Sequence, residues 1–246
     1  MKEVLLIIDP QNDFVDPKGS LYIPGAEKGI EEICKVIKER NPHKIIITQD
    51  THQPYHIGHP CYWKGAILPF TKIGIEDIKS GKHEPKFLGS IGKRNLVNYF
   101  SKLPEKTHTV WPEHCIEGTW GWVFPENLVE TLKDWQLKNR GKSYEVIQKG
   151  MDPNHEMYSA FTRIDRSGIG VKVNTQIRQL SRYDKVLISG FAKDVCVSWS
   201  VQDLYLSGLF KDKLVFLDAC MTGLDPKAKT LEIYEECVTK EGAIWE

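Results

Sequence analysis

Short apolar runs rich in β-branched residues recur along this chain, at 3–8, 44–48, 144–148, 185–189 and 213–217. Stretches with a helical spacing of apolar positions follow several of them, at 26–39, 126–134, 173–182, 195–208 and 227–239. Runs that are apolar nearly throughout are typical of strands buried on both faces, as in a parallel sheet covered by helices. The alternation therefore predicts an α/β fold: a doubly wound parallel sheet with helices on both faces, and ligands at the carboxyl ends of its strands.

Residues 60–110 depart from this alternation. They contain five glycines, clustered aromatic residues, and nine Lys or Arg against four Asp or Glu. A chain of 246 residues can form one α/β unit, so we expect a single domain over 1–246 with 60–110 as an insertion within it. The insertion has four interpretations: a lid over the site, an oligomer contact, an anion-recruiting patch, or a solvated excursion. Lys-rich faces are usually just solvated, which favours the last.

The composition excludes several classes of protein. Lys plus Arg equal Asp plus Glu at 33 each, so no overall field draws the chain to nucleic acid or to a membrane. The apolar start at 4–8 is too short for a secretory signal or a membrane span. The six cysteines are scattered without a CxxC pair, which is typical of reduced thiols. These features predict a soluble, cytoplasmic protein with no nucleic-acid or membrane partner.

Cys196 stands where the apolar run 185–189 gives way to a helical pattern that begins near Asp194. A cysteine in the first turn of a helix lies near the positive end of the macrodipole and near unpaired N–H groups, which lower the pKa of its thiol. This placement predicts an activated nucleophile. The alternative is ordinary packing, because cysteine is among the most buried residue types, and position alone favours that alternative.

Two further strand ends carry charged side chains. Asp9 directly follows the run 3–8, and Lys149 directly follows the run 144–148. The carboxyl ends of parallel strands meet at one edge of the sheet, so an acid, an ammonium group and the Cys196 thiol can share one crevice. Taken singly, each position has a simpler interpretation, since an Asp before Pro suits a turn and a Lys suits a solvated site.

A second group of polar residues contains an acid and several histidines. Asp50 and His52 are two residues apart after the second predicted strand, so in an extended segment both side chains can reach one ion. His114 stands far along the chain, and two close ligands plus a remote one are typical of a metal site with open positions. His56 and His59 lie nearby in the sequence. The spacing alone is unspecific, because His-rich loops are often merely polar.

Six short stretches match one family in order and span the chain apart from 60–110: LIIDPQNDF at 6–14, TQDTH at 48–52, WPEHCIEGT at 111–119, KG at 149–150, YSAF at 158–161 and GFAKDVCV at 190–197. On these stretches the sequence resembles the isochorismatase-like cysteine hydrolases and, among them, the nicotinamidases. The resemblance implies the three-layer sandwich of that superfamily, in which a parallel sheet lies between two layers of helices.

The resemblance also implies roles for particular residues. Cys196 matches the nucleophile, Asp9 the acid beside it and Lys149 the third catalytic residue. The backbone N–H groups of Ala192 and Cys196 match the oxyanion hole, next to a cis peptide bond between Phe191 and Ala192. These matches make Cys196 a catalytic residue and displace the packing interpretation.

The same resemblance implies a substrate pocket and a metal. The aromatic positions of the pocket match Phe14 and Trp111, joined by Phe191, which stands where smaller aliphatic residues are more familiar in the family. The metal ligands match Asp50, His52 and His114. Imidazole and carboxylate ligands suit zinc, with iron and manganese as alternatives. Whether His56 or His59 adds a ligand stays open.

The activity implied by the resemblance is hydrolysis of nicotinamide to nicotinate and ammonia through a cysteine thioester, in NAD salvage, by a homo-oligomer acting on a small-molecule amide. Two departures leave another amide open as the substrate: the long stretch from His52 to His114, and the unfamiliar segment 153–157. Rival hypotheses are a metallohydrolase that uses metal-activated water, with Cys196 merely structural, and a binding protein that keeps the fold without catalysis.

Overall fold

A six-stranded sheet forms the centre of the molecule in the computed structural model, which describes residues 1–87, 92–164, 170–172 and 174–246. The strand order is β10-β9-β8-β1-β2-β5, and every neighbouring pair is parallel. The strands are β1 (Glu3–Ile8), β2 (Lys44–Asp50), β5 (Glu145–Lys149), β8 (Lys185–Phe191), β9 (Leu214–Thr222) and β10 (Ile244–Trp245). The chain builds outward from β1 in one direction and then from β8 in the other, so the strand order reverses between β1 and β8. Ligand sites form at such switch points.

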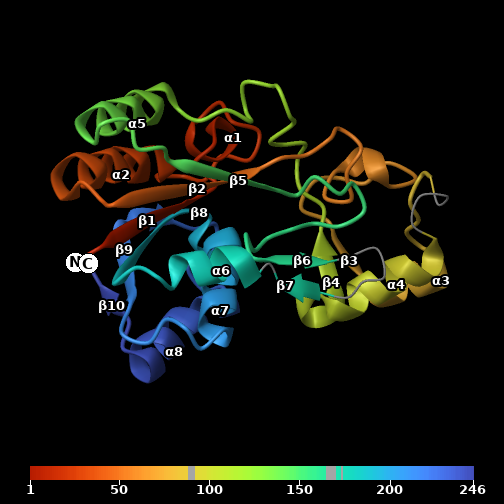
Figure 1. Ribbon diagram of the computed structural model, residues 1–246. Coiled ribbons are helices and arrows are strands. Elements are labelled where there is room, and N and C mark those ends of the chain that lie inside the picture. The colour runs from red at the N-terminus through yellow and green to blue at the C-terminus, as the bar shows by residue number, and fades with distance from the viewer. Residues whose placement is uncertain (88–91, 165–169, 173) are drawn as a thin grey trace.

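Helices cover both faces of this sheet (Figure 1). One face carries α1 (Asn12–Val15), α2 (Ala26–Arg40) and α5 (Glu126–Lys138), and the other carries α6 (Asn174–Leu180), α7 (Ser198–Leu206) and α8 (Glu232–Glu241). Each face has its own hydrophobic cluster: Leu5 and Ile7 of β1 belong to one, while Val4 and Leu6 belong to the other. The predicted doubly wound α/β sandwich is therefore confirmed. None of the helices in the described ranges is long and apolar enough to cross a membrane.

The ends of several elements differ from the predicted ones. The strand expected to stop at 189 continues through Gly190 to Phe191, with a shift in its register against β9 between Ile188 and Gly190. Gly190 has φ +116°, and a Cβ there would lie 2.1 Å from the carbonyl oxygen of Ile8. The glycine thus extends the strand by allowing β1 and β8 to approach closely, instead of ending it.

Two predicted helices are interrupted. The stretch 195–208 forms a π-helical turn at Lys193–Val197 followed by α7, and the stretch 227–239 forms a 3₁₀ turn at Lys229–Leu231 followed by α8. Short elements were missed: β10 and the two small antiparallel pairs, β3 (Lys72–Gly74) with β4 (Thr107–Thr109) and β6 (Thr162–Ile164) with β7 (Gly170–Lys172). Residue 173, at the start of the predicted helix 173–182, lies outside the described residues.

The region 60–110 packs around a hydrophobic cluster of its own. It contains a 3₁₀ turn at Pro60–Tyr62, α3 (Ile75–Ser80), α4 (Lys93–Lys102) and a 3₁₀ turn at Pro104–Lys106, and it lies beyond the carboxyl ends of the strands (Figure 1). Its fully buried side chains include Trp63, Tyr99 and Phe100. Residues 88–91 lie outside the described part. Although charged outside, the region therefore buries a core and is more than a solvated excursion.

Candidate active site

The three reactive side chains predicted at strand ends lie together. Asp9 directly follows β1, Lys149 is the last residue of β5, and Cys196 lies in the π-helical turn that follows β8. The Lys149 ammonium nitrogen is 3.0 Å from Asp9 Oδ2 and 3.7 Å from Cys196 Sγ. Thr48 of β2 holds the other oxygen of Asp9, since its hydroxyl donates to Oδ1 at 2.5 Å. All four side chains are buried.

Burial dominates the protonation of this group. It raises the pKa of Asp9, against the opposing charge of Lys149. It also raises the pKa of the Cys196 thiol well above its usual range, although Lys149 opposes this. The expectation that a helix start would lower the pKa of this thiol is therefore wrong, because desolvation of the buried thiol outweighs the nearby cation. A thiol with a raised pKa would need a base to take its proton before the sulfur could act as a nucleophile.

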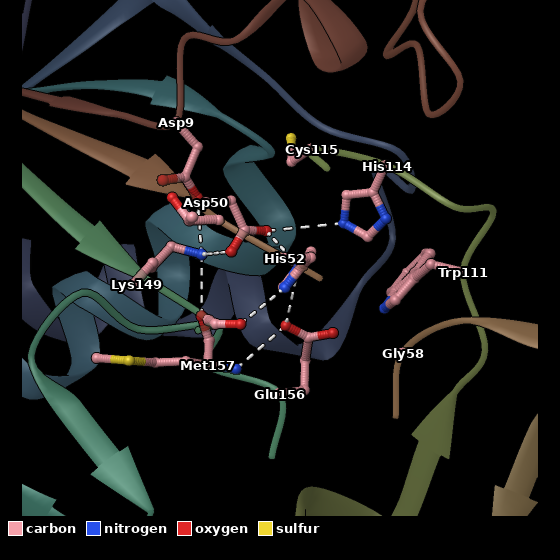
Figure 2. A network of polar contacts seen from close by, with 12 residues as sticks. Asp9, Asp50, His52, Gly58, Trp111, His114, Cys115, Lys149, Glu156 and Met157 are labelled. Carbon is pink, nitrogen blue, oxygen red and sulfur yellow. Dashed lines mark hydrogen bonds and ion pairs between the residues drawn. The ribbon is translucent and has the colours of Figure 1, made fainter. Parts of the chain in front are cut away.

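Lys149 joins this catalytic corner to a second cluster (Figure 2). Its ammonium nitrogen lies 3.1 Å from Asp50 Oδ1, at the end of β2, and donates to the carbonyl oxygen of Met157 at 2.9 Å. Burial would lower the pKa of Lys149, but Asp50 and Asp9 outweigh it and hold the pKa well above its usual range. The other oxygen of Asp50, Oδ2, is 3.1 Å from His52 Nε2 and 3.7 Å from His114 Nε2.

Three buried imidazoles are arranged like metal ligands. Ring nitrogens of His52, His59 and His114 all lie within 4.8 Å of one another. Each Nδ1 lies against a backbone carbonyl oxygen, that of Gly150 at 2.9 Å, Pro54 at 3.2 Å and Pro112 at 2.8 Å. Since a carbonyl only accepts, each Nδ1 donates, and Nε2 is the atom that could bind an ion, as in most metal-bound histidines. Without an ion, Nε2 of His52 lies 3.1 Å from Asp50 Oδ2 and Nε2 of His59 accepts from the His114 backbone N–H at 3.5 Å. The structure thus groups His59, which the sequence left open, with two predicted ligands.

The electrostatics of the imidazoles differ. Burial would lower the pKa of His52, but Asp50 and Glu156 outweigh it and raise that pKa to about 9. Burial, together with repulsion from His114, lowers the pKa of His59 to about 3. Burial also holds the pKa of His56 well below its usual range, and His56 packs on His52 with ring centroids 4.0 Å apart. Neutral imidazoles such as His56 and His59 are the form that binds metals.

Two positions at the site, Glu156 and Gly150, were not predicted as site residues. The buried carboxyl of Glu156 has Oε1 3.6 Å from His52 Nε2, and no spacing pattern in 150–158 points to it. Gly150 has φ +76°, and a Cβ there would lie 2.6 Å from His52 Cε1 and 2.7 Å from Asp50 Oδ1. Its identity as the second residue of the Lys-Gly pair was visible in the sequence, but its contact with His52 depends on the fold.

A pocket, which measures ≈ 370 Å³ including open solvent, opens onto both clusters. Its lining includes Cys196 and Ala192 on one side, Asp50, His114 and Glu156 on another, and the aromatic side chains of Phe14, Trp111 and Tyr158. Trp111 is fixed by donating from Nε1 to the Tyr158 hydroxyl at 3.2 Å. A small, partly aromatic pocket with a thiol at its wall suits a flat ring that carries a carbonyl group.

Phe191 does not lie among the residues that line this pocket. It is fully buried in the hydrophobic cluster between the sheet and α2, where a Cβ on Gly29 would come 2.8 Å from its ring. Side chains alternate between the faces of a strand, and the extension of β8 to Phe191 turns this ring toward α2. The Phe191–Ala192 peptide bond is cis, and Ala192 lines the pocket.

A larger cavity lies elsewhere. It measures ≈ 1130 Å³ including open solvent and is lined by the exposed basic and aromatic side chains of Lys2, His43, Arg178, Arg182 and Tyr183, with Thr175 and Gln179. Lys2 precedes β1, which places this cavity at the amino ends of the strands. It contains none of the predicted site residues, which leaves the smaller pocket as the candidate active site.

The charges around the site fit a divalent cation. Asp9, Asp50 and Glu156 bring three buried carboxyl groups to a space that holds one ammonium, that of Lys149. Uncompensated buried charge is costly; the raised pKa of His52 reflects this excess of carboxyl groups, and a bound cation would supply positive charge to the cluster. Imidazole and carboxylate donors suit zinc, iron or manganese. Asp50, His52, His59 and His114 therefore form a suitable metal site.

Comparison with known proteins finds several related nicotinamidases. The chain is 30% identical over 198 residues to a nicotinamidase of Schizosaccharomyces pombe, which covers 78% of this chain and 72% of that protein. It is 27% identical over 207 residues to a nicotinamidase of Saccharomyces cerevisiae, with 79% and 77% covered. No family model matches the sequence.

Solved structures share the fold. The yeast nicotinamidase bound to the inhibitor nicotinaldehyde superimposes with a TM-score of 0.68 at 23% identity, covering 99% of this chain and 98% of that chain. The pyrazinamidase of Pyrococcus horikoshii in complex with zinc superimposes with a TM-score of 0.57 at 22% identity, covering 100% and 99%.

Proposed function

This chain belongs to the nicotinamidase family of isochorismatase-like cysteine hydrolases, and from that premise we propose that it hydrolyses nicotinamide to nicotinate and ammonia through a thioester on Cys196. The observation that carries the proposal is the contact of one buried ammonium, Lys149, with both the Asp9 carboxyl and the Cys196 thiol at the wall of an aromatic pocket. This arrangement has the parts of an acyl-transfer site: nucleophile, base and countercharge.

The reaction follows from these positions. Asp9 accepts the Cys196 proton while the sulfur attacks the carboxamide carbon, and Lys149 stabilises the charges that develop. The backbone N–H groups of Ala192 and Cys196 hold the tetrahedral oxyanion, and one such donor is typically worth ~3–4 kcal/mol. Asp9 then returns its proton to the departing ammonia. Finally Asp9 deprotonates a water molecule, which hydrolyses the thioester and regenerates the thiol.

A divalent metal completes the proposed site. Asp50, His52 and His114 would bind it together with His59, and zinc is the first candidate because a related pyrazinamidase binds zinc, with iron and manganese as alternatives. When bound, the ion supplies a Lewis-acid contact for the ring nitrogen of the substrate. Phe14 and Trp111 pack against the ring, and Asp50 holds the Lys149 ammonium in place.

Broader properties stay predictions. They are a single domain with the insertion 60–110, homo-oligomeric assembly, a cytoplasmic location and a place in NAD salvage. Size-exclusion chromatography with light scattering tests the assembly, and cell fractionation tests the location.

Ammonia release from nicotinamide and from benzamide tests the proposal. Benzamide is the matched control because it differs only by a CH in place of the ring nitrogen. We expect kcat/KM to favour nicotinamide by on the order of 10²-fold or more, since a site built to bind a polar atom rejects the analogue that lacks it. A chelator should abolish this preference and added Zn²⁺ should restore it. Turnover of another amide without turnover of nicotinamide would refute nicotinamide as the substrate.

A further inference from the structure

Glu156 is a buried carboxyl group that the mechanism above does not use. It lies between the imidazole cluster and the pocket: Oε1 is 3.6 Å from His52 Nε2, Oε2 is 3.8 Å from His56 Nδ1, and the side chain lines the substrate pocket beside Asp50 and His114. Figure 2 shows Asp50 and Glu156 approaching His52 from different sides. A carboxyl group that is nine-tenths or more buried needs a partner.

The hydrogen bonds of Glu156 leave one oxygen free. Oε1 accepts from the Met157 N–H at 3.1 Å, which fixes the direction of the side chain. Oε2 is buried and has no hydrogen-bond partner within the described ranges. Gly58 leaves the space for it, since a Cβ at that position would lie 2.4 Å from Oε2. An unpartnered buried carboxyl oxygen beside ring nitrogens is typical of a cation ligand.

His56 shares this corner but is less suited to bind an ion. Its Nδ1 already accepts from the Gly58 N–H at 3.2 Å, which occupies the lone pair of that nitrogen. Nδ1 as acceptor puts the proton of the neutral ring on Nε2. His56 Nε2 and Glu156 Oε2 are both buried without a hydrogen-bond partner within the described residues, but with its proton on Nε2 the ring offers no lone pair there, whereas Glu156 Oε2 is an acceptor. The His56 ring packs on His52.

We propose that Glu156 is a second carboxylate ligand of the metal, placed across His52 from Asp50. This inference rests on the metal site of the proposed function. Because Asp50, His114 and Glu156 all line the pocket, an ion held by these residues would lie at the wall of the pocket, within reach of a bound substrate.

Binding of Co²⁺ to the metal-free full-length protein tests the ligand without any use of activity. Glu156→Gln keeps the size of the side chain and an acceptor for the Met157 N–H but removes the charge. We expect its Kd for Co²⁺ to rise about 10–100-fold and the visible absorption of bound Co²⁺ to change in position or intensity. Glu113→Gln is the control, because this exposed carboxyl lies next to His114 in the sequence and outside the pocket lining; its Kd and spectrum should match those of the parent protein.

Gly58→Ala gives a second measurement that does not change the charge. A Cβ at this position displaces the Glu156 carboxyl, so Co²⁺ affinity should fall here too, and this variant decides the matter if Glu156→Gln does not fold. A parent-like Co²⁺ spectrum and Kd in a folded Glu156→Gln protein would overturn the proposal, and so would weaker binding with an unchanged spectrum. A parent protein that binds Co²⁺ but releases no ammonia from nicotinamide would instead refute the proposed function and leave Glu156 as a ligand.

Discussion

The catalytic corner and the imidazole cluster are built in different ways. Asp9 follows β1 and Lys149 ends β5 of the same parallel sheet, and Cys196 follows β8 within a few residues. Of the imidazole cluster, His56, His59 and His114 lie on irregular segments, and each of His52, His59 and His114 is oriented by a backbone carbonyl oxygen. Rigid strand ends suit a reaction that needs exact distances. Loops held by carbonyl groups suit an ion, which organises its own ligands.

One ammonium connects the two regions. The Lys149 ammonium lies 3.0 Å from the Asp9 carboxyl and 3.1 Å from the Asp50 carboxyl. It therefore compensates the charge of one carboxyl group in the catalytic corner and of one beside the imidazole cluster. Substitutions in the two regions should therefore differ in their effects. One at the nucleophile should lower the reaction rate alone, one at Lys149 should affect both regions, and one beside Asp9 should change only the pKa of that carboxyl.

Cys196→Ala should separate the two regions most strongly. Loss of the nucleophile should lower kcat for nicotinamide by on the order of 10⁴-fold or more, because Cys196 is the one cysteine among the described residues that line the pocket. Metal affinity should stay that of the parent protein, since Sγ lies among the catalytic groups and not among the imidazoles. Ammonia release and Co²⁺ titration measure the two effects. Full activity in this variant would refute the thiol mechanism and favour the rival in which metal-activated water attacks.

Lys149→Met should damage both regions at once. Removing the ammonium leaves Asp9 and Asp50 buried without their shared countercharge, so the free energy of unfolding should fall by about 3–5 kcal/mol. Urea denaturation at neutral pH measures this loss.

The matched control for that variant is Lys64→Met in the insertion. Lys64 pairs with Glu84 at 2.8 Å, but the two side chains are 53% and 35% exposed, so the loss should stay below about 1 kcal/mol. Equal losses in the two variants would show that the buried ammonium has no special role in stability.

Thr48→Val should have the smallest effect, and this effect should be confined to the Asp9 carboxyl, which acts as the base. The variant removes the hydroxyl that donates to Asp9 and accepts from its backbone N–H, a loss of about 1 kcal/mol or about five-fold in kcat/KM. The hydroxyl lowers the pKa of Asp9, which burial has raised, so the variant should raise that pKa further. Because Asp9 must be ionised to accept the thiol proton, activity falls as the pH drops through this pKa.

The acidic limb of the pH profile of kcat/KM should therefore lie above the ordinary aspartate value of 3.8 in the parent protein and move to still higher pH in Thr48→Val. Thr131→Val is the control, since Thr131 is buried in α5 and donates to a backbone carbonyl far from the site. A limb that stays in place in Thr48→Val would show that another group limits activity at low pH.

The sequence predicts the fold and most of the candidate site because periodicity marks where strands end. Asp9 and Lys149 follow apolar runs directly, and the parallel arrangement alone brings such positions to one edge. Asp50, His52 and His114 were identified by spacing and by family resemblance, and the structure places them together. Their roles in catalysis and metal binding stay predictions.

What could not be predicted depends on the path of the backbone outside periodic segments. Glu156 lies in a loop where neither a helical nor a strand period assigns its direction, and His59 joins its partners only through the turn around Pro54. Phe191 was assigned to the pocket by its position in the family match, whereas the strand continues through it and its ring packs in the hydrophobic cluster beside α2. The pKa of Cys196 depends on its burial by residues that are distant in the sequence, and the local sequence pattern does not indicate that burial.

Gly150 shows that shape alone can make a position irreplaceable. Every larger residue would have to adopt a left-handed backbone and also push aside His52 and Asp50, while its carbonyl must keep accepting from His52. In a survey of random substitutions this position would tolerate as little as Cys196, although it carries no reactive group. Loss of function on replacement of Gly150 would be due to the space that His52 and Asp50 occupy, because the residue has no reactive side chain of its own.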